Sequence, residues 1–357
     1  MKEFSCGTKI IMGANAVSAL KEYRFQRLLV VSDPFFSKNG WAERLGKMAQ
    51  NYEIFDKVAP DPTVALVAEG TAGMLDFKPD GIVALGGGSA MDCAKAMAYF
   101  SGLHIPLIAV PTTSGSGSEV TDFAIVTHDG IKHPLVDSSL RPCAAILEPE
   151  LLAQMPPALI ADSGFDVLAH ALEAWVGKNA SPITDALALN AFQSVCSLLP
   201  DSFAGKKEAR LDIHISATMA GLAFTHAGLG LCHALSHSLG GQFHVPHGRL
   251  NAILLPAVIS CNTDVAPRYA ALARLTGLGG SSDAMAVRNL KNALVRLRRQ
   301  LQLPATLKEA GVDMTQLEDK SGEIVACTLK DPCCKTNPAP VTEQMVHRIL
   351  QEVAGRG

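Results

Sequence analysis

Gly-Ile-Val-Ala-Leu-Gly-Gly-Gly-Ser-Ala-Met-Asp, residues 81–92, is the stretch that decides the fold of this chain. Its run Ile82 to Leu85 is apolar throughout, which is typical of a strand buried on both faces of a parallel sheet. Glycines follow, and a helix is predicted to open at Ala90. Glycines let a phosphate approach the backbone, and the free N–H groups of a helix start attract an anion. The stretch therefore predicts an α/β domain with a phosphate-binding loop.

A purely structural interpretation of this loop stays open. Ser89 and Asp92 fit a capping box, and glycines alone can make a tight turn. The run also lacks the third glycine of the dinucleotide fingerprint at its usual offset. The phosphate interpretation is strengthened by a second loop, residues 111–119, which is rich in hydroxyl groups and glycines and leaves the next predicted strand. A serine-rich surface turn is the alternative for that loop.

Further strands and helices alternate on either side of the glycine loop. Strands are predicted at 27–32, 52–58, 81–85 and 107–110, helices at 41–50 and 63–77, and a short edge hairpin within 4–12. Such alternation predicts a parallel, Rossmann-like doubly wound sheet, which binds ligands at the carboxyl ends of its strands. Asp33 follows the first of these strands, where it would bind an adenosine ribose and repel a 2′-phosphate, favouring NAD over NADP. An ordinary turn aspartate fits its spacing as well.

The alternation of predicted strands and helices stops near Pro157. We expect the domain boundary there, between an α/β domain, residues 1–157, and an all-helical domain, residues 158–357. Beyond it, helices are predicted at 164–176, 184–199, 206–224, 230–239, 248–262 and 266–276, with more after Asp283 and over 341–353. A chain of 357 residues is long enough for two domains, and a net charge of -3 gives no reason to expect nucleic acid.

Histidines gather between residues 233 and 247. His233 and His237 are four apart and would share one helix face, and the pair Gly240-Gly241 is expected to end that helix and let His247 return. The cluster indicates a metal or proton-transfer centre, and the alternative is a set of core histidines that only satisfy hydrogen bonds. His244 competes as a ligand.

Asp166 and His170 are also four apart, on a strongly apolar predicted helix. Burying an aspartate there is costly unless something such as a divalent cation compensates its charge. The alternative is a capping box between Ser163 and Asp166. One carboxylate with two or three imidazoles suits zinc, ferrous iron, cobalt or nickel. His214 and His226 are spaced off these pairs and are expected to pack or face solvent.

Composition and termini favour a cytoplasmic enzyme without a membrane partner. The N-terminus lacks a signal-peptide pattern, and the nine cysteines include no Cys-x-x-Cys pair, which indicates a reducing compartment. The most apolar long segment, residues 219–239, is interpreted as a buried helical hairpin.

The motifs together resemble the iron-dependent (group III) alcohol dehydrogenases, with a closer likeness to the 1-propanol dehydrogenase branch of propanediol-utilisation bacterial microcompartments. The resemblance covers nearly the whole chain and follows family order through Asp33, 86–92, 111–121, Asp166-x-x-x-His170 and 233–247. Segments 60–63, 170–175 and 240–248 carry the closer likeness. It implies the dehydroquinate synthase-like architecture, an NAD(H) cofactor, and interconversion of short aldehydes such as propanal and acetaldehyde with primary alcohols.

The resemblance also implies roles for individual residues. The metal, normally iron(II) with zinc as the alternative, would be held by Asp166, His170, His233 and His247, while His237 would stand beside the nicotinamide as the catalytic residue. Cofactor contacts would come from Asp33, Gly87, Gly88, Ser89, Asp92, Thr112, Thr113, Ser116 and Lys132. A small apolar substrate pocket would be bounded by Phe123, Phe224 and Cys333.

Departures and alternatives accompany the resemblance. Ser116 stands where many relatives have threonine, and Arg249 stands where relatives often have an apolar residue, with an effect that the sequence does not predict. A homodimer is expected, and shell or cargo enzymes of a microcompartment would be further partners. The competing functions are a lactaldehyde, polyol or glycerol dehydrogenase of the same superfamily and, from another class, a metal-dependent hydrolase.

Overall fold

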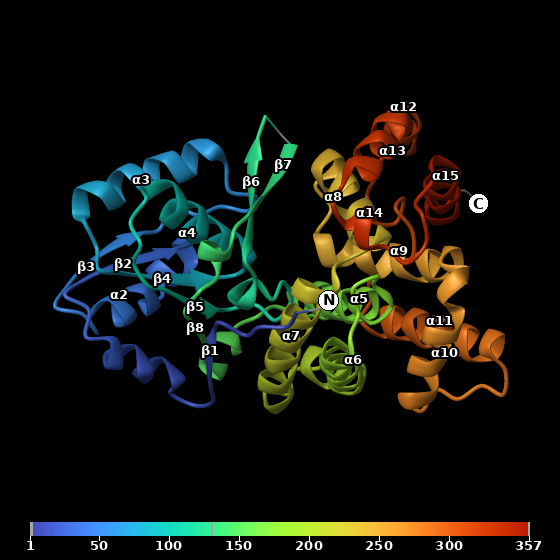
Figure 1. Cartoon of the computed structure of the whole chain (residues 1–357), viewed down its shortest axis with the longest axis horizontal. Coiled ribbons are helices and arrows are strands. Elements are labelled where there is room, and N and C mark those ends of the chain that lie inside the picture. The colour runs from blue at the N-terminus through green and yellow to red at the C-terminus, as the bar shows by residue number, and fades with distance from the viewer. Residues whose placement is uncertain (1–2, 130, 356–357) are drawn as a thin grey trace. The chain divides into compact units, whose positions relative to one another are not determined.

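The structure is a computed structural model that describes residues 3–129 and 131–355. The described chain divides into two compact units (Figure 1). One unit spans residues 5–155, and the other combines residues 156–355 with residues 3 and 4.

The first unit is built on a six-stranded sheet in which every pair of neighbouring strands is parallel. Its order is β1-β8-β5-β4-β2-β3. The strands are β1 (Lys9–Met12), β2 (Arg27–Ser32), β3 (Asn51–Phe55), β4 (Gly81–Gly86), β5 (Leu107–Pro111) and β8 (Ala144–Leu147). The predicted parallel α/β fold is therefore confirmed.

Alternate residues of each central strand supply the cores on the two faces of this sheet. Ile82 and Ala84 pack with α3 (Val64–Phe77) and α4 (Gly88–Ser101) on one face. Val83 and Leu85 pack on the other face, where α1 (Pro34–Lys38), α2 (Trp41–Gly46) and η1 (Ala16–Tyr23) lie. Because both faces are covered, the central strands are apolar throughout, and this is why they could be predicted from the sequence.

Two features of this unit differ from the prediction. Residues 4–12 form no hairpin, because β1 pairs in parallel with β8, more than a hundred residues later in the chain. A separate antiparallel pair, β6 (Phe123–His128) and β7 (Ile131–Val136), was not predicted.

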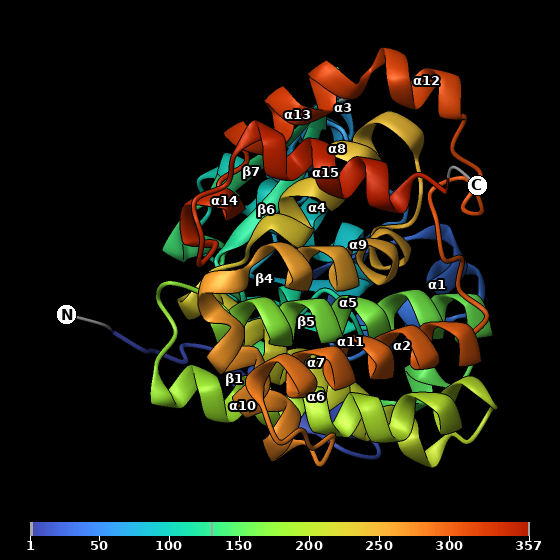
Figure 2. The same cartoon turned by 90° about the vertical axis from the view of Figure 1, so that its right-hand side faces the viewer.

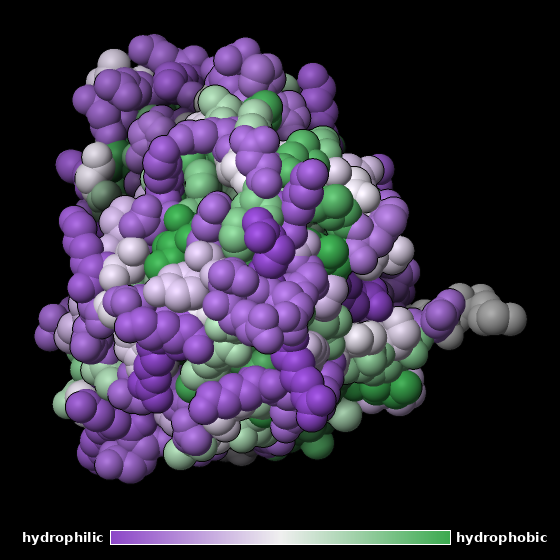
Figure 3. Space-filling view, turned by 90° about the vertical axis from the view of Figure 1, so that its left-hand side faces the viewer, coloured by the Kyte–Doolittle hydropathy of each residue, from purple (hydrophilic) through white to green (hydrophobic). Residues whose placement is uncertain are grey.

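Polar side chains dominate the face drawn in Figure 3, with apolar side chains scattered between them.

The second unit is helical, as predicted. Its helices are α5 (Pro157–Val176), α6 (Pro182–Phe203), α7 (Glu208–Ala227), α8 (Leu231–Phe243), α9 (His247–Cys261), α10 (Ala266–Leu275), α11 (Asp283–Gln300), α12 (Met314–Asp319), α13 (Ser321–Lys330), α14 (Cys333–Thr336) and α15 (Glu343–Val353). Helix α5 is buried from Ile160 to its end and crosses the unit between α9 on one side and α6 and α7 on the other (Figure 2).

Three predicted helix boundaries were wrong. The pair Gly240-Gly241 lies inside α8, which ends at His244 with a left-handed backbone (φ 54°), so the turn that returns the chain is made by residues 244–246. Helix α5 begins at Pro157, so Ser163 lies inside it and its hydroxyl donates to the Leu159 carbonyl instead of forming a capping box. Helix α4 has Gly87 as its N-cap, without a side-chain cap, so the Ser89 capping box is also absent.

Among the described residues, no single helix has the length and apolar character needed to cross a membrane. Helices α7 and α8 reach that threshold only as a pair, and they are bent by 106° at their junction.

Candidate metal centre and cofactor loops

Three of the four candidate metal ligands are histidines that converge on a carboxylate oxygen of the fourth, Asp166. From Asp166 Oδ1, the distances are 3.5 Å to His247 Nε2, 3.7 Å to His233 Nε2 and 3.8 Å to His170 Nε2. Asp166 and His170 share a face of α5 because they are four residues apart, His233 lies in the first turn of α8, and His247 opens α9. Three helices thus bring together side chains that are up to 81 residues apart, between Asp166 and His247.

The chemistry of these side chains fits a divalent cation. His233 is 1% exposed, and its Nε2 makes no hydrogen bond to any described residue although it is buried. Asp166, His233 and His247 each offer a ligand atom, and these atoms lie within 4.8 Å of one another. Burial raises the pKa of Asp166, but the surrounding imidazoles outweigh burial and hold that pKa well below its usual range. A carboxylate with imidazole nitrogens suits iron, zinc and similar ions.

Two buried residues that the sequence reasoning missed hold these ligands. Asn251 Nδ2 donates to Asp166 Oδ1 at 2.8 Å, and the ring of His233 bonds through Nδ1 to Glu173 Oε2 at 2.6 Å. Burial lowers the pKa of His233, but Glu173 and Asp166 raise it to about 9. Glu173 was detectable in the sequence, because it follows Asp166 by seven residues and so shares its helix face.

Arg249, whose role the sequence left open, pairs with Asp162. Its Nε and Nη2 atoms lie 3.2 and 3.0 Å from the two carboxylate oxygens, so the contact is bidentate and ties α9 to α5 one turn before Asp166. Gly248 allows this approach, because a Cβ there would lie 1.8 Å from the Asp162 carbonyl oxygen. The pair fixes the start of α9, where His247 lies.

His237 belongs to a neighbouring polar cluster. Its Nδ1 lies 2.8 Å from Asp331 Oδ2, and its ring stacks on that of His247 with centroids 5.2 Å apart. Asp331 Oδ1 accepts the backbone N–H of Cys333 at 2.8 Å. Burial raises the pKa of Asp331, but the hydrogen bond and charge of His237 outweigh it and lower that pKa to about 2. No sequence spacing links His237 with Asp331, which lie 94 residues apart.

The remaining histidines and the pocket residues are distributed over several elements. His244 is exposed at the end of α8, His214 is buried in α7, and the ring of His226 contacts Phe4. Phe224 stacks on His170 with centroids 4.4 Å apart, and Cys333 opens α14 beside Asp331. Phe123 opens β6 in the other unit.

The two predicted cofactor loops lie side by side in the first unit. Strands β4 and β5 end together, with Gly86 paired to Pro111 and the Thr112 N–H donating to the Gly86 carbonyl. A Cβ on Gly87 would lie 3.2 Å from the Thr113 hydroxyl, and one on Gly88 would lie 3.3 Å from Ser116. Glycine at these two positions therefore favours the close approach of the two loops at the carboxyl edge of the sheet, because a Cβ would make the neighbouring side chain shift by a few tenths of an ångström.

Three other predicted cofactor residues, Asp33, Asp92 and Lys132, make contacts within the first unit. Asp33 caps α1 through Oδ1, while its Oδ2 lies 3.5 Å from the position that a Cβ on Gly86 would occupy. Asp92 accepts the Ser118 hydroxyl at 3.0 Å, and burial raises its pKa to about 6 although Lys95 opposes this. Lys132 forms an ion pair of 2.7 Å with Asp61.

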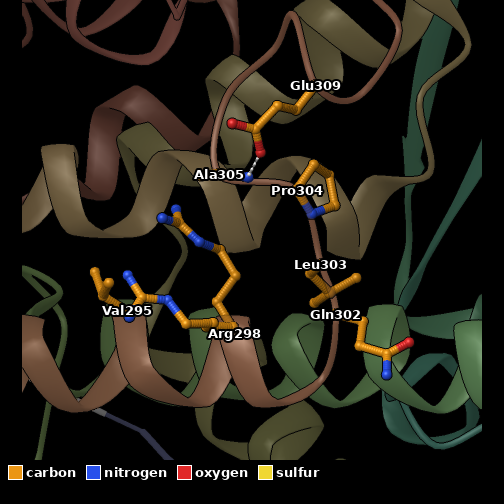
Figure 4. Close-up of a pocket in the computed structure, with 8 residues that line it drawn as sticks. Val295, Arg298, Gln302, Leu303, Pro304, Ala305 and Glu309 are labelled. Carbon is orange, nitrogen blue, oxygen red and sulfur yellow. Dashed lines mark hydrogen bonds between the residues drawn. The ribbon is translucent and has the colours of Figure 1, made fainter.

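A cavity of about 480 Å³ lies away from these residues, at the end of α11 (Figure 4). Its lining includes Arg298, Gln302, Leu303 and Glu309. Arg298 already donates to the Ala252 carbonyl, and Glu309 accepts the Ala305 N–H, so these two charged groups serve the local fold.

Comparison with known families and proteins agrees with this arrangement. Residues 7–149 match the family "Iron-containing alcohol dehydrogenase", and residues 160–354 match "Fe-containing alcohol dehydrogenase family, C-terminal". The chain belongs to the iron-containing alcohol dehydrogenase family. The enzyme is thus an oxidoreductase that acts on a small alcohol or aldehyde, and the alternative of a metal-dependent hydrolase is not supported.

Its relatives cover nearly the whole chain. The enzyme is 38% identical over 372 residues to the 1-propanol dehydrogenase PduQ of Salmonella typhimurium, covering 99% of the chain and 100% of that protein. It is 34% identical to an NADPH-dependent butanol dehydrogenase of Clostridium saccharobutylicum, with coverage of 98% and 97%.

Solved structures show the same fold. The iron-containing alcohol dehydrogenase of Thermococcus thioreducens has a TM-score of 0.93 at 31% identity, with coverage of 99% and 100%. The sulfoacetaldehyde reductase of Bifidobacterium kashiwanohense, solved in complex with NAD+, has a TM-score of 0.88 at 28% identity, with both chains covered completely.

Proposed function

We propose that this enzyme interconverts short-chain aldehydes, such as propanal and acetaldehyde, with primary alcohols, using NAD(H) and iron(II). The observation that carries the proposal is the convergence of three imidazole Nε2 atoms on Asp166 Oδ1 in a chain of this family. The likeness to 1-propanol dehydrogenases supports a substrate of propanal size.

In this proposal, Asp166, His170, His233 and His247 hold the metal. When bound, a divalent ion supplies Lewis acidity that stabilises the developing alkoxide and lowers the pKa of an alcohol. The burial of the His233 ring and the hydrogen bond from Asn251 to Asp166 keep these ligand atoms in place.

His237 would carry the proton. Since its Nδ1 bonds to Asp331, its Nε2 is the atom that would give a proton to the product alcohol or take it back. A histidine suits this task because its two ring nitrogens can donate and accept protons. Phe224 and Cys333 would bound the substrate on this unit.

The glycine loops would hold the cofactor. Gly87, Gly88 and Ser89 would bind the pyrophosphate at the start of α4, with Thr112, Thr113 and Ser116 lining the groove. Asp92 and Lys132 complete the proposed contacts. Asp33 would favour NAD(H) by repelling a 2′-phosphate. The relatives include an NADPH-dependent enzyme, so the preference is best measured by comparing NADH with NADPH directly.

The organisation and location of the enzyme form a further part of the proposal. The division of the chain into two compact units between residues 155 and 156 supports an NAD-binding domain over 1–157 and a metal-binding domain over 158–357. A homodimer, and a place inside a bacterial microcompartment with shell or cargo enzymes as partners, are proposed from the family resemblance. A cytoplasmic location is proposed from the cysteine content. Light scattering would test the dimer, and co-purification with shells would test encapsulation.

A polyol or lactaldehyde substrate is the second candidate, because a 1,3-propanediol oxidoreductase has a TM-score of 0.93 and 30% identity to this chain. NADH oxidation by the anaerobically purified, iron-loaded enzyme should be compared for propanal, acetaldehyde, lactaldehyde and dihydroxyacetone. The highest kcat/KM is expected for propanal. Inactivity across the whole series would refute the proposed function.

The ligand assignment is tested by His247→Ala, with His244→Ala as the matched control from the same segment. His247→Ala is expected to lose both metal and turnover, whereas His244→Ala keeps both because His244 is exposed and lies outside the cluster. Metal content is measured by elemental analysis. Full activity of metal-free His247→Ala would contradict the assignment.

A further inference from the structure

Glu173 is a buried carboxylate, and each of its two oxygens accepts a hydrogen bond from a backbone N–H. It is 4% exposed and lies on α5, on the helix face that also carries Asp166 and His170. Its Oε1 accepts the Cys232 N–H at 2.7 Å, and its Oε2 accepts the Gly230 N–H at 2.8 Å. A third hydrogen bond to Glu173 joins its Oε2 to His233 Nδ1 at 2.6 Å. Both oxygens therefore face N–H donors.

This pattern fixes where the proton of the His233 contact lies. An oxygen at which a backbone N–H already points is an acceptor, so the proton between Glu173 and His233 belongs to Nδ1 of the ring. A ring that donates from Nδ1 presents the lone pair of Nε2, and that atom is the one 3.7 Å from Asp166 Oδ1. The carboxylate thus selects both the tautomer and the orientation of the ring.

Charge points to the same role. The four proposed ligands carry one negative charge, from Asp166, which leaves a divalent ion with an excess positive charge in a buried site. Glu173 supplies a second buried negative charge at the back of His233. A carboxylate bonded to a ligating imidazole makes that imidazole a stronger donor to the metal.

We infer that Glu173 is a positioning residue for the metal, acting through His233, and that it sets how tightly the centre retains a divalent cation. The inference rests on the proposed ligand set.

A merely structural role for Glu173 has to be separated from this one. Helix α8 begins after Gly230, which has no side-chain cap, and Glu173 serves as the missing cap from another helix. Asn337 does the same from a different direction, because its Oδ1 accepts the Leu231 N–H at 3.1 Å. Asn337 does not hydrogen-bond to His233 among the described residues, so it provides a matched control for helix capping.

The experiment compares wild type, Glu173→Gln and Asn337→Ala as full-length, metal-stripped proteins under anaerobic conditions. The dissociation constants of iron(II) and cobalt(II) are measured by competition with a chelator, and Tm is measured on the same samples. Glu173→Gln is expected to weaken metal binding about 10- to 100-fold and to shift the visible spectrum of bound cobalt. Asn337→Ala is expected to lower Tm while leaving the dissociation constant within about threefold of wild type.

The outcomes distinguish the two proposals. Wild-type affinity in Glu173→Gln, or metal affinity that simply follows Tm in both variants, overturns the role of Glu173 and leaves the ligand set standing. Unchanged affinity in His247→Ala overturns the ligand set itself.

A measurement on the wild type keeps the inference testable if Glu173→Gln does not fold. In zinc-loaded protein with 15N-labelled histidine, His233 is expected to be protonated at Nδ1 and to bind zinc through Nε2. Its resonance is assigned by its loss in His233→Gln. Coordination through Nδ1 would overturn the inference.

Discussion

Lys95→Met is expected to remove a large, specific pH dependence from the stability of the N-terminal unit. Lys95 is 0% exposed beneath the second cofactor loop. Its Nζ lies 2.9 Å from the Thr121 hydroxyl and from the Phe123 carbonyl, and 3.1 Å from the Ser118 hydroxyl. Burial lowers its pKa from 10.5 to about 8, although nearby carboxylates such as Asp92 oppose this.

The lowered pKa of Lys95 determines the sign and the size of this pH dependence of stability. Between about pH 8 and 10.5 the unfolded chain binds a proton that the folded chain has released, so the free energy of unfolding rises with pH. Each pKa unit corresponds to about 1.4 kcal/mol, and integration from pH 8 to pH 10 gives a gain of about 2 kcal/mol. The gain is absent below pH 7, where both states hold the proton, and it is absent at any pH in Lys95→Met.

Fluorescence can report on this unit alone, because the chain has two tryptophans and only Trp41 lies in it. In a Trp175→Phe background, urea unfolding of the parent and of Lys95→Met is followed at pH 8, 9 and 10. Lys38→Met serves as the control, since Lys38 is exposed on α1. The difference in unfolding free energy between parent and Lys95→Met should increase by about 2 kcal/mol. A difference that stays constant across this range would refute the reasoning.

Two more predictions concern the metal-binding unit. Gly248→Ala should lower Tm and metal retention together, because the new Cβ would overlap the Asp162 carbonyl and force α9, with His247, away from α5. Calorimetry measures the Tm and elemental analysis measures the bound metal. An unchanged Tm would contradict the prediction. Asp331→Asn should lower kcat about 10-fold with KM and metal content unchanged, because His237 loses the partner that orients its ring. In a His237→Ala background the same substitution should have no effect on steady-state kinetics, and an additive loss would show that Asp331 acts elsewhere.

Much of the fold was predictable because the signals were local. Apolar runs such as Ile82 to Leu85 are typical of strands buried on both faces, and the glycines after them mark the loop. The pairing of β1 with β8 was not predictable, because it joins segments far apart in the chain. The glycines at 240 and 241 suggested a helix end, but α8 continues through them and ends at Phe243, with the left-handed His244 as its C-cap.

The candidate site likewise has features that could be predicted from local spacing and features that could not. Helical spacing placed Asp166 with His170, and His233 with His237, on shared faces, and it could not separate a ligand from a neighbour. The structure gives these histidines different partners, since His233 bonds to Glu173 and His237 to Asp331. Glu173 lies within reach of helical periodicity. Asp331 does not, because its meeting with His237 depends on the packing of α13 and α14 against α8.

Helix α5 carries Asp166, His170 and Glu173 on a single face while being buried from Ile160 to Val176. A residue inserted or deleted between Asp166 and Glu173 would rotate everything beyond it by about 100° around the helix axis. That rotation would turn the carboxylate away from α8 and an apolar side chain into the cluster. Length changes in the evolution of this chain are therefore expected in its loops, and the spacing within α5 should tolerate substitution far better than any change in the number of residues.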